Sequence, residues 1–213
     1  MSISKLKEVS LAAGAVAVSG RKSGAAQEKA VDELIARLKD KNDRVRGEAL
    51  LSAGKFGAPA VKPLAKVMAD EDVEVVRAAK RALWKIVRHA GRPRARDERR
   101  AITSELIGLL GDDQPTSVRR EVLWMLSEIA QRRFVSEIAV LLSNKELRED
   151  ARMVLERIPG RQSLAALEDG LKAAPKGFKL NIAQSLRQRG VKVSGLPCVK
   201  LVPTKKTNVK PLK

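Results

Sequence analysis

Apolar positions recur with helical spacing along most of the chain. Leu147, Ala151, Val154 and Ile158 stand at i, i+4, i+7 and i+11, which places them on one face of an α-helix. Five segments of this kind begin with an apolar residue followed at once by a cation, and these cations are Arg46, Arg77, Arg119, Arg148 and Lys179. They are separated by 31, 42, 29 and 31 residues. A period of about 30 residues with two helices per unit predicts an α-solenoid.

A partner helix is expected before each of the five segments. The first partner helix carries apolar residues at Val31, Leu34 and Leu38. The connections within pairs are short and polar, as in 41–43 and 70–72, and their Asp and Asn side chains can cap the helix that follows. Short connections make neighbouring helices antiparallel. We therefore predict an all-α fold: a right-handed α-solenoid of about five helix pairs, with an N-terminal capping helix and an extended basic C-terminal tail.

The chain divides into three parts on this interpretation. Residues 1–27 form an N-terminal capping half-repeat and a basic linker, 28–190 form the solenoid with a basic insert at 88–100, and 191–213 form the tail. The half-repeat, at residues 3–18, rests on a match between 11–14 and 51–54 at an offset of 40. A secretory signal at 1–17, with an A-x-A site at 15–17, is the competing interpretation. Glu8 interrupts its basic start, so we favour the half-repeat and a cytoplasmic protein.

Two strings in the second helices carry a family resemblance. They run from Asp43 to Leu50 (DRVRGEAL) and from Val75 to Ala79 (VVRAA), and each lies in a unit of about 31 residues. These strings resemble HEAT repeats, most closely the short repeats of phycobilisome-lyase-like proteins. The resemblance covers 28–190 and is looser in the last three units, where Lys179 replaces the usual arginine of the fifth.

The resemblance implies roles for charged residues. In HEAT repeats an aspartate of the turn and an arginine of the second helix form a ladder between neighbouring units, and the second helices line the concave face. The partners implied here are Asp43 with Arg46, Asp72 with Arg77, and Asp113 with Arg119. Members of the family are mainly scaffolds and binding surfaces, with a few enzymes, so the fold alone does not decide the function.

Composition argues against catalysis and against a metal or cofactor site. The chain has one cysteine, Cys198, and one histidine, His89, which are too few for a metal centre or a disulfide framework. No nucleophile and base are recognisable as a pair. No apolar run approaches the ~20 residues that cross a bilayer. We expect a non-catalytic protein without cofactor, metal or transmembrane segment.

Positive charge is concentrated in two regions. The formal net charge is +18, and after Asp169 the sequence has 11 cations and no acidic residue. The other region surrounds the basic insert: Arg77, Arg81, Lys85 and Arg88 form one stripe about 16 Å long, at ~1.5 Å per residue. Like charges at i and i+4 repel each other, and a polyanion would relieve that repulsion.

The charge distribution predicts a module that docks on a polyanion, most plausibly the phosphate backbone of structured RNA, the ribosome or duplex DNA. The alternative is a scaffold or adaptor that binds an acidic protein or an anionic membrane surface. The chain is expected to act as a monomer or as part of a larger assembly. The predicted contact residues are Lys80, Arg81, Lys85, Arg88, Arg92, Arg94, Arg96, Arg99, Arg100, Arg187, Arg189, Lys192, Lys200, Lys205, Lys206 and Lys210.

Aromatic residues make up only 2% of the chain. Trp84 and Trp124 lie inside predicted helix pairs, where we expect both rings in the core. Proteins that read single strands stack bases on exposed aromatic rings. Without such rings, binding is expected to use phosphates and shape, with little sequence preference and a strong dependence on salt.

Overall fold

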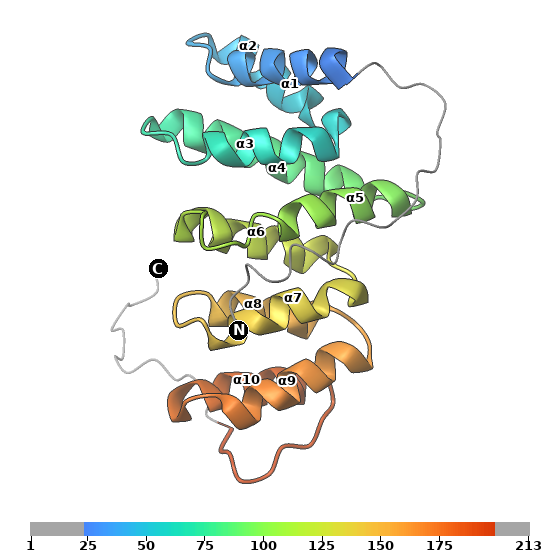
Figure 1. The fold of residues 1–213 in the computed structure, drawn as a ribbon, viewed down its shortest axis with the longest axis vertical. Helices are drawn as coiled ribbons and strands as arrows, with labels where there is room; N and C mark the ends of the chain where they lie inside the picture. The colour runs from blue at the N-terminus through green and yellow to red at the C-terminus, as the bar shows by residue number, and fades with distance from the viewer. Residues whose placement is uncertain (1–23, 199–213) are drawn as a thin grey trace, which may run out of the picture.

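The computed structural model describes residues 24–198 and confirms the predicted all-α solenoid. Five antiparallel helix pairs stack in chain order from α1 and α2 to α9 and α10 (Figure 1). Connections within pairs lie along one edge of the stack and connections between pairs along the opposite edge (Figure 1). The proposed half-repeat at 3–18, the alternative signal at 1–17 and the tail beyond residue 198 lie outside the described residues.

The second helix of each pair packs on the second helix of the next pair, so that α2, α4, α6, α8 and α10 form one layer. The α-helices are α1 (Gly24–Leu38), α2 (Asp43–Ser52), α3 (Val61–Val67), α4 (Val73–Ala90), α5 (Arg96–Ile107), α6 (Thr116–Ile129), α7 (Val135–Ala139), α8 (Arg148–Arg157), α9 (Arg161–Ala173) and α10 (Lys176–Gln188). Short 3₁₀ turns are η2 (Ala53–Phe56), η3 (Ala58–Ala60), η4 (Arg132–Phe134) and η5 (Val140–Ser143).

Polar residues of the turns cap two of the second helices, as predicted, and a third accepts bonds in the turn before α8. Asn42 accepts a hydrogen bond from the backbone N–H of Arg44, and Asp72 accepts from Glu74 and Val75. Asn144 accepts from the N–H groups of residues 146 and 147. These bonds satisfy amides that the helix itself leaves unpaired. Turn chemistry in the sequence therefore locates the starts of α2 and α4.

The segment predicted as a basic insert is mostly helical. The α4 helix continues to Ala90 and α5 begins at Arg96, so only residues 91–95 connect the two helices. Asp97 and Glu98 lie in the first turn of α5, where negative charge stabilises the positive end of the helix dipole. Most of the segment 88–100 is therefore helical, and Arg96, Arg99 and Arg100 lie on α5.

Tryptophans and cations join successive second helices. Lys80 Nζ lies 3.2 Å from Glu121, and Trp84 donates its indole N–H to the same carboxylate at 2.7 Å. The arrangement recurs one unit later, where Arg120 Nε and Trp124 Nε1 contact Asp150 at 3.2 Å and 2.7 Å. In each case a cation and a tryptophan four residues later hold one carboxylate of the next unit.

The prediction that both tryptophan rings lie in the core is wrong for Trp124. Trp84 packs against the core, whereas Trp124 is 44% exposed. The physical reason is the hydrogen bond to Asp150, which draws the indole of Trp124 across the junction between α6 and α8. One aromatic ring is therefore accessible on the layer of second helices.

The charge ladder implied by the HEAT resemblance is only partly present. Arg46 pairs with Asp43 as expected, but both residues lie within α2, and Arg46 also donates to the carbonyl of Asp40 at 2.7 Å. Arg77 pairs with Glu74 at 2.6 Å instead of Asp72, whose carboxylate caps α4. In the third unit the buried Arg119 lies 2.9 Å from Asp112.

Arg189 joins the last two units. Its Nη1 donates to the carbonyls of Leu155, Glu156 and Ile158 at 2.9–3.1 Å, and its Nη2 donates to Gly160 O at 3.1 Å. The last carbonyl groups of a helix such as α8 receive no hydrogen bond from the helix itself. A cation at this end is also attracted by the negative end of the helix dipole. Arg189 therefore caps α8 from the following unit.

The first residues of the tail pack against the last helix. Residues 191–198 are not helical, as expected of an extended segment. Val191 and Val193 pack partly against the core, and Arg187 donates to the carbonyls of Val193 and Leu196 at 3.2 Å and 2.5 Å. The first residues of the predicted tail therefore contact the repeat core.

Replacing Glu121 with alanine is expected to lower the free energy of unfolding by about 1–3 kcal/mol, because Lys80 and the Trp84 indole lose their shared acceptor. Urea unfolding followed by tryptophan fluorescence measures this change. Glu128→Ala is the matched control on the same helix, since Glu128 is half exposed and pairs with the exposed Arg157. The control should cost less than about 1 kcal/mol. Equal losses in the two variants would contradict the role of the Trp84 contact.

Candidate functional site

An exposed row of cations lies on α4. Arg77, Arg81, Lys85 and Arg88 are all exposed, as their spacing predicts. The four cations differ in their ion pairs. Arg77 pairs with Glu74, whereas Arg81 and Lys85 have no ion pair among residues 24–198. The guanidinium of Arg88 lies 5.4 Å from the centroid of the Trp84 ring, a cation–π contact that leaves its charge uncompensated. Lys80 is turned aside toward Glu121.

The connection from α4 to α5 continues this row. Arg92 is anchored to the protein, because it donates to the His89 carbonyl at 2.7 Å and to Glu98 at 2.6 Å. The hydrogen bond from Arg92 to Glu98 raises the pKa of the guanidinium, which keeps it charged. Arg94 is exposed and adopts a φ of 66°, the left-handed region that costs an ordinary side chain energy. In this connection the side chain of Arg94 is therefore exposed, whereas that of Arg92 is fixed by hydrogen bonds.

The beginning of α5 adds further cations. Arg96 and Arg100 are exposed and have no ion pair within the described part of the chain, whereas Arg99 is partly buried. Six predicted residues thus form an exposed set that no carboxylate of 24–198 neutralises. We call this set the α4–α5 surface, and it consists of Arg81, Lys85, Arg88, Arg94, Arg96 and Arg100.

The C-terminal residues predicted for the site are not part of the α4–α5 surface. Arg187 and Arg189 donate to carbonyls of the protein itself, so both have structural partners. Lys192 is exposed at the start of the tail. Lys200, Lys205, Lys206 and Lys210 lie outside the described residues. Most of the predicted residues that are exposed and lack an ion pair in the described part of the chain accordingly lie on α4, on α5 and in the connection between them.

The sequence interpretation missed three arginines near this surface. Arg132, Arg133 and Arg157 lie at the connections between later units, and they line a cavity of about 570 Å³ together with Arg99. Arg132 and Arg133 stand side by side in the sequence, which was a usable signal. Arg157 could not be recognised, because its position opposite Glu128 depends on the packing of α8 on α6.

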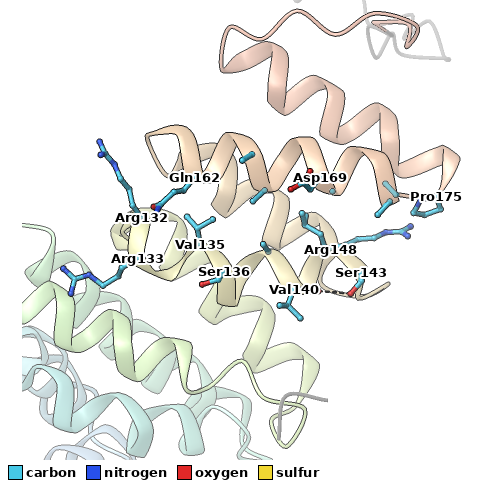
Figure 2. Close-up of a pocket in the computed structure, with 17 residues that line it drawn as sticks. Arg132, Arg133, Val135, Ser136, Val140, Ser143, Arg148, Gln162, Asp169 and Pro175 are labelled. Carbon is cyan, nitrogen blue, oxygen red and sulfur yellow. Dashed lines mark hydrogen bonds between the residues drawn. The ribbon is translucent and has the colours of Figure 1, made fainter. Parts of the chain in front are cut away.

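A different concavity lies between α7 and α9. This groove has a volume of about 1020 Å³ and a lining that includes Ala139, Ala166 and Gly170. Figure 2 shows Arg132 and Arg133 pointing away from it at the start of α7, with Asp169 nearer its other end. Asp169 already forms an ion pair with Lys172 at 2.8 Å. The groove is thus mainly apolar, in contrast to the α4–α5 surface.

Other classes of site find no support in the described part of the chain. Within residues 24–198, no three His, Cys, Asp or Glu side chains gather in a way that could hold a metal ion. In the same range, no helix combines the length and the apolar character that crossing a bilayer requires.

The sequence and the structure are similar to known repeat proteins. Residues 7–84 match the family described as HEAT repeats. A comparison with curated proteins gave no match. Among solved structures, a designed armadillo repeat protein in complex with the peptide (KR)4 is 20% identical, with 75% of this chain and 82% of that one covered and a TM-score of 0.41. A computationally designed armadillo repeat protein for modular peptide recognition has the same identity and coverage and a TM-score of 0.42. An engineered protein from a structural genomics consortium is 20% identical over 78% of this chain and 84% of its own, with a TM-score of 0.41.

Proposed function

We propose that the chain, whose residues 7–84 match the family of HEAT repeats and whose helix pairs continue to Gln188, is a non-catalytic binding module that docks on the phosphate backbone of nucleic acid. A repeat solenoid is a binding or scaffold architecture, and this much follows from the fold. The choice of nucleic acid is supported by one observation, namely the six exposed, unneutralised cations of the α4–α5 surface.

The distribution of ion pairs supports a polyanion over general solubility. Acidic side chains neutralise cations elsewhere on the solenoid, as in Lys39–Asp70, Lys62–Glu105 and Arg157–Glu128. A surface that served solubility alone would intersperse both signs in the same way on α4. Repulsion between Arg81 and Lys85, four residues apart, instead remains uncompensated and would be relieved by phosphates. An acidic protein partner is the alternative that the experiment must separate.

The test is a titration of the full chain against labelled 20-base-pair duplex DNA and duplex RNA, with poly-glutamate as the acidic-protein control. Six phosphate contacts predict a slope of log K against log salt of about −5 and an affinity loss of about 10³-fold between about 50 and about 200 mM salt. Tighter binding of poly-glutamate than of either duplex would favour the protein partner. Absence of nucleic-acid binding at low salt would refute the proposal.

A single-stranded RNA belongs in the same titration because of Trp124. Its ring is 44% exposed on α6, which packs directly against α4. Stacking of a base on an accessible aromatic side chain contributes about 1–3 kcal/mol. If single strands bind more tightly than duplexes, Trp124→Leu should abolish the preference without changing the salt slope.

Arg94→Gly is expected to raise the free energy of unfolding by up to about 1 kcal/mol while weakening nucleic-acid binding. Glycine adopts a φ of 66° without steric cost, although it loses more backbone entropy on folding. The side chain of Arg94 is exposed, so its removal costs contact with phosphate and little packing. Urea unfolding and the duplex titration measure the two effects. Arg94→Ala is the control, with the same affinity loss and no gain in stability; a loss of stability in the glycine variant would contradict this account.

A further inference from the structure

A cavity lies where two consecutive units, the third and the fourth helix pair, meet. It has a volume of about 570 Å³ and is lined by Arg99 of α5, the end of α6, the connection 130–133, and residues 157 and 159. Its size falls within the range of about 300–1,000 Å³ that is usual for small-molecule sites. We call it the inter-unit pocket. Each unit contributes to its wall, so the stacking of the units creates it.

The charge of the inter-unit pocket is strongly positive. Four arginines, Arg99, Arg132, Arg133 and Arg157, face a single carboxylate, Glu128. Arg157 neutralises that carboxylate at 2.6 Å. The other three arginines form no ion pair with any residue from 24 to 198. A concave site with this excess of guanidinium groups attracts an anion.

Two donors in the pocket wall have no acceptor within residues 24–198. Nε of Arg99 and Nε2 of Gln131 are buried and make no hydrogen bond with another described residue. A buried donor without an acceptor costs about 1–3 kcal/mol, so such groups are uncommon in folded proteins. Both groups belong to residues that line the same cavity. An atom of a ligand bound in the pocket can accept these bonds.

The backbone permits the close approach of Arg132 to the connection between α8 and α9. Gly160 has a φ of 108°, and a Cβ atom at this position would lie only 2.9 Å from Nε of Arg132. Any larger residue at 160 would therefore displace the guanidinium. Arg132 is in this way held across the edge of the stack, with its donors available to a ligand.

The inter-unit pocket lies on the edge that the α4–α5 surface also reaches. Connections between units run along this edge (Figure 1), including 91–95 and 130–134. Gly91 lies next to Ile129 at the end of α6, which places the two connections close together. Arg99, which lines the pocket, is on α5 between Arg96 and Arg100 of the α4–α5 surface. The pocket and that surface therefore share the helix α5.

We propose that the inter-unit pocket binds a phosphate group, with Arg99, Arg132 and Arg133 as its main contacts. Guanidinium groups match the oxygens of phosphate in geometry and can each donate two hydrogen bonds. The identity of the phosphate carrier rests on the proposed function, in which the pocket holds one phosphate of a nucleic acid that crosses the α4–α5 surface. The binding of the group itself can be tested without nucleic acid.

The experiment is a titration of the ¹⁵N-labelled full chain with inorganic pyrophosphate, followed through the Nε–Hε signals of arginine and the side-chain amide signals of glutamine. We expect the signals of Arg99 and Gln131 to shift together and to saturate at millimolar pyrophosphate. Substituting Arg132→Gln and Arg133→Gln together should weaken this binding about tenfold or more. Both side chains are exposed, so the variant should keep the dispersed spectrum of the folded protein.

Two matched variants separate a specific pocket from general charge. Arg161→Gln removes an exposed arginine that lies at the start of α9 and does not line the pocket, so pyrophosphate binding should be unchanged. Glu128→Gln removes the one carboxylate and should tighten binding. The proposal is overturned if Arg99 and Gln131 do not respond to pyrophosphate, or if Arg161→Gln weakens binding as much as the double variant does.

The outcomes also distinguish this inference from the proposed function. Saturable pyrophosphate binding in a protein that binds no nucleic acid would refute the proposed function and support a site for a small phosphorylated ligand. Nucleic-acid binding with no response of Arg99 and Gln131 would support the α4–α5 surface and refute the pocket.

Discussion

Replacing Arg189 with methionine is expected to lower the free energy of unfolding by about 2–4 kcal/mol. The guanidinium donates to four backbone carbonyls and to Ser163 Oγ, across the junction of the last two units. Methionine keeps most of the length of the side chain but leaves these acceptors unpaired, and each such loss costs about 1 kcal/mol or more. Urea unfolding followed by circular dichroism measures the change.

Arg187→Met is the control for this prediction. Arg187 precedes Arg189 by two residues, and its donors reach the carbonyls of Val193 and Leu196 at the start of the tail. Because residues 191–198 carry no helix, their release should cost less than about 1 kcal/mol. If the two variants lose equal stability, Arg189 does not act as the cap of α8.

Replacing Arg81, Lys85, Arg96 and Arg100 together with glutamine is expected to weaken nucleic-acid binding about 100-fold or more at low salt and to reduce the salt slope by about four. These side chains are exposed and unpaired within the described structure, so the melting temperature should change little. Arg88 is kept in this variant because its contact with Trp84 contributes to packing. Fluorescence anisotropy at several salt concentrations provides both the affinity and the slope.

The matched control changes the same net charge elsewhere on the chain. It replaces four exposed lysines of other units with glutamine: Lys29, Lys41, Lys145 and Lys176. If only the total charge matters, both variants lose the same affinity, and the assignment of the α4–α5 surface is wrong. Arg46→Gln adds a contrast, because loss of its bonds to Asp40 and Asp43 should lower stability and leave affinity almost intact.

Properties that depend on one helix at a time could be predicted from the sequence. The spacing of Leu147, Ala151 and Val154 predicts a buried face on α8, and all three residues are fully buried. The spacing of Arg81 and Lys85 likewise predicts one exposed row. Both predictions rest on the 3.6-residue period, which each helix imposes on its own residues regardless of its neighbours. Short polar connections then suffice to make the pairs antiparallel.

A pattern of a cation and a tryptophan four residues later occurs twice in the sequence, and its meaning became clear only in the structure. The segments Lys80–Trp84 (KRALW) and Arg120–Trp124 (REVLW) lie 40 residues apart and share a cation, a leucine and a tryptophan. In the structure both segments make the same contact, because the tryptophan of each donates a hydrogen bond to a carboxylate of the next second helix. This offset of 40 differs from the 42 that separates Arg77 from Arg119. The contacts of Trp84 and Trp124 with the next unit show that the offset of 40 aligns α4 with α6.

The sequence alone thus determined the helix pairs, their order and the row of cations on α4, because hydrophobic period and turn chemistry act within one unit. Tertiary structure decided the partners between units: Trp84 with Glu121, Arg189 with the end of α8, and Arg99 with Gln131 around one pocket. Such partners depend on how far each helix is rotated and shifted against its neighbour. Residue spacing within a helix leaves these two quantities open, and the packing of side chains between units determines them.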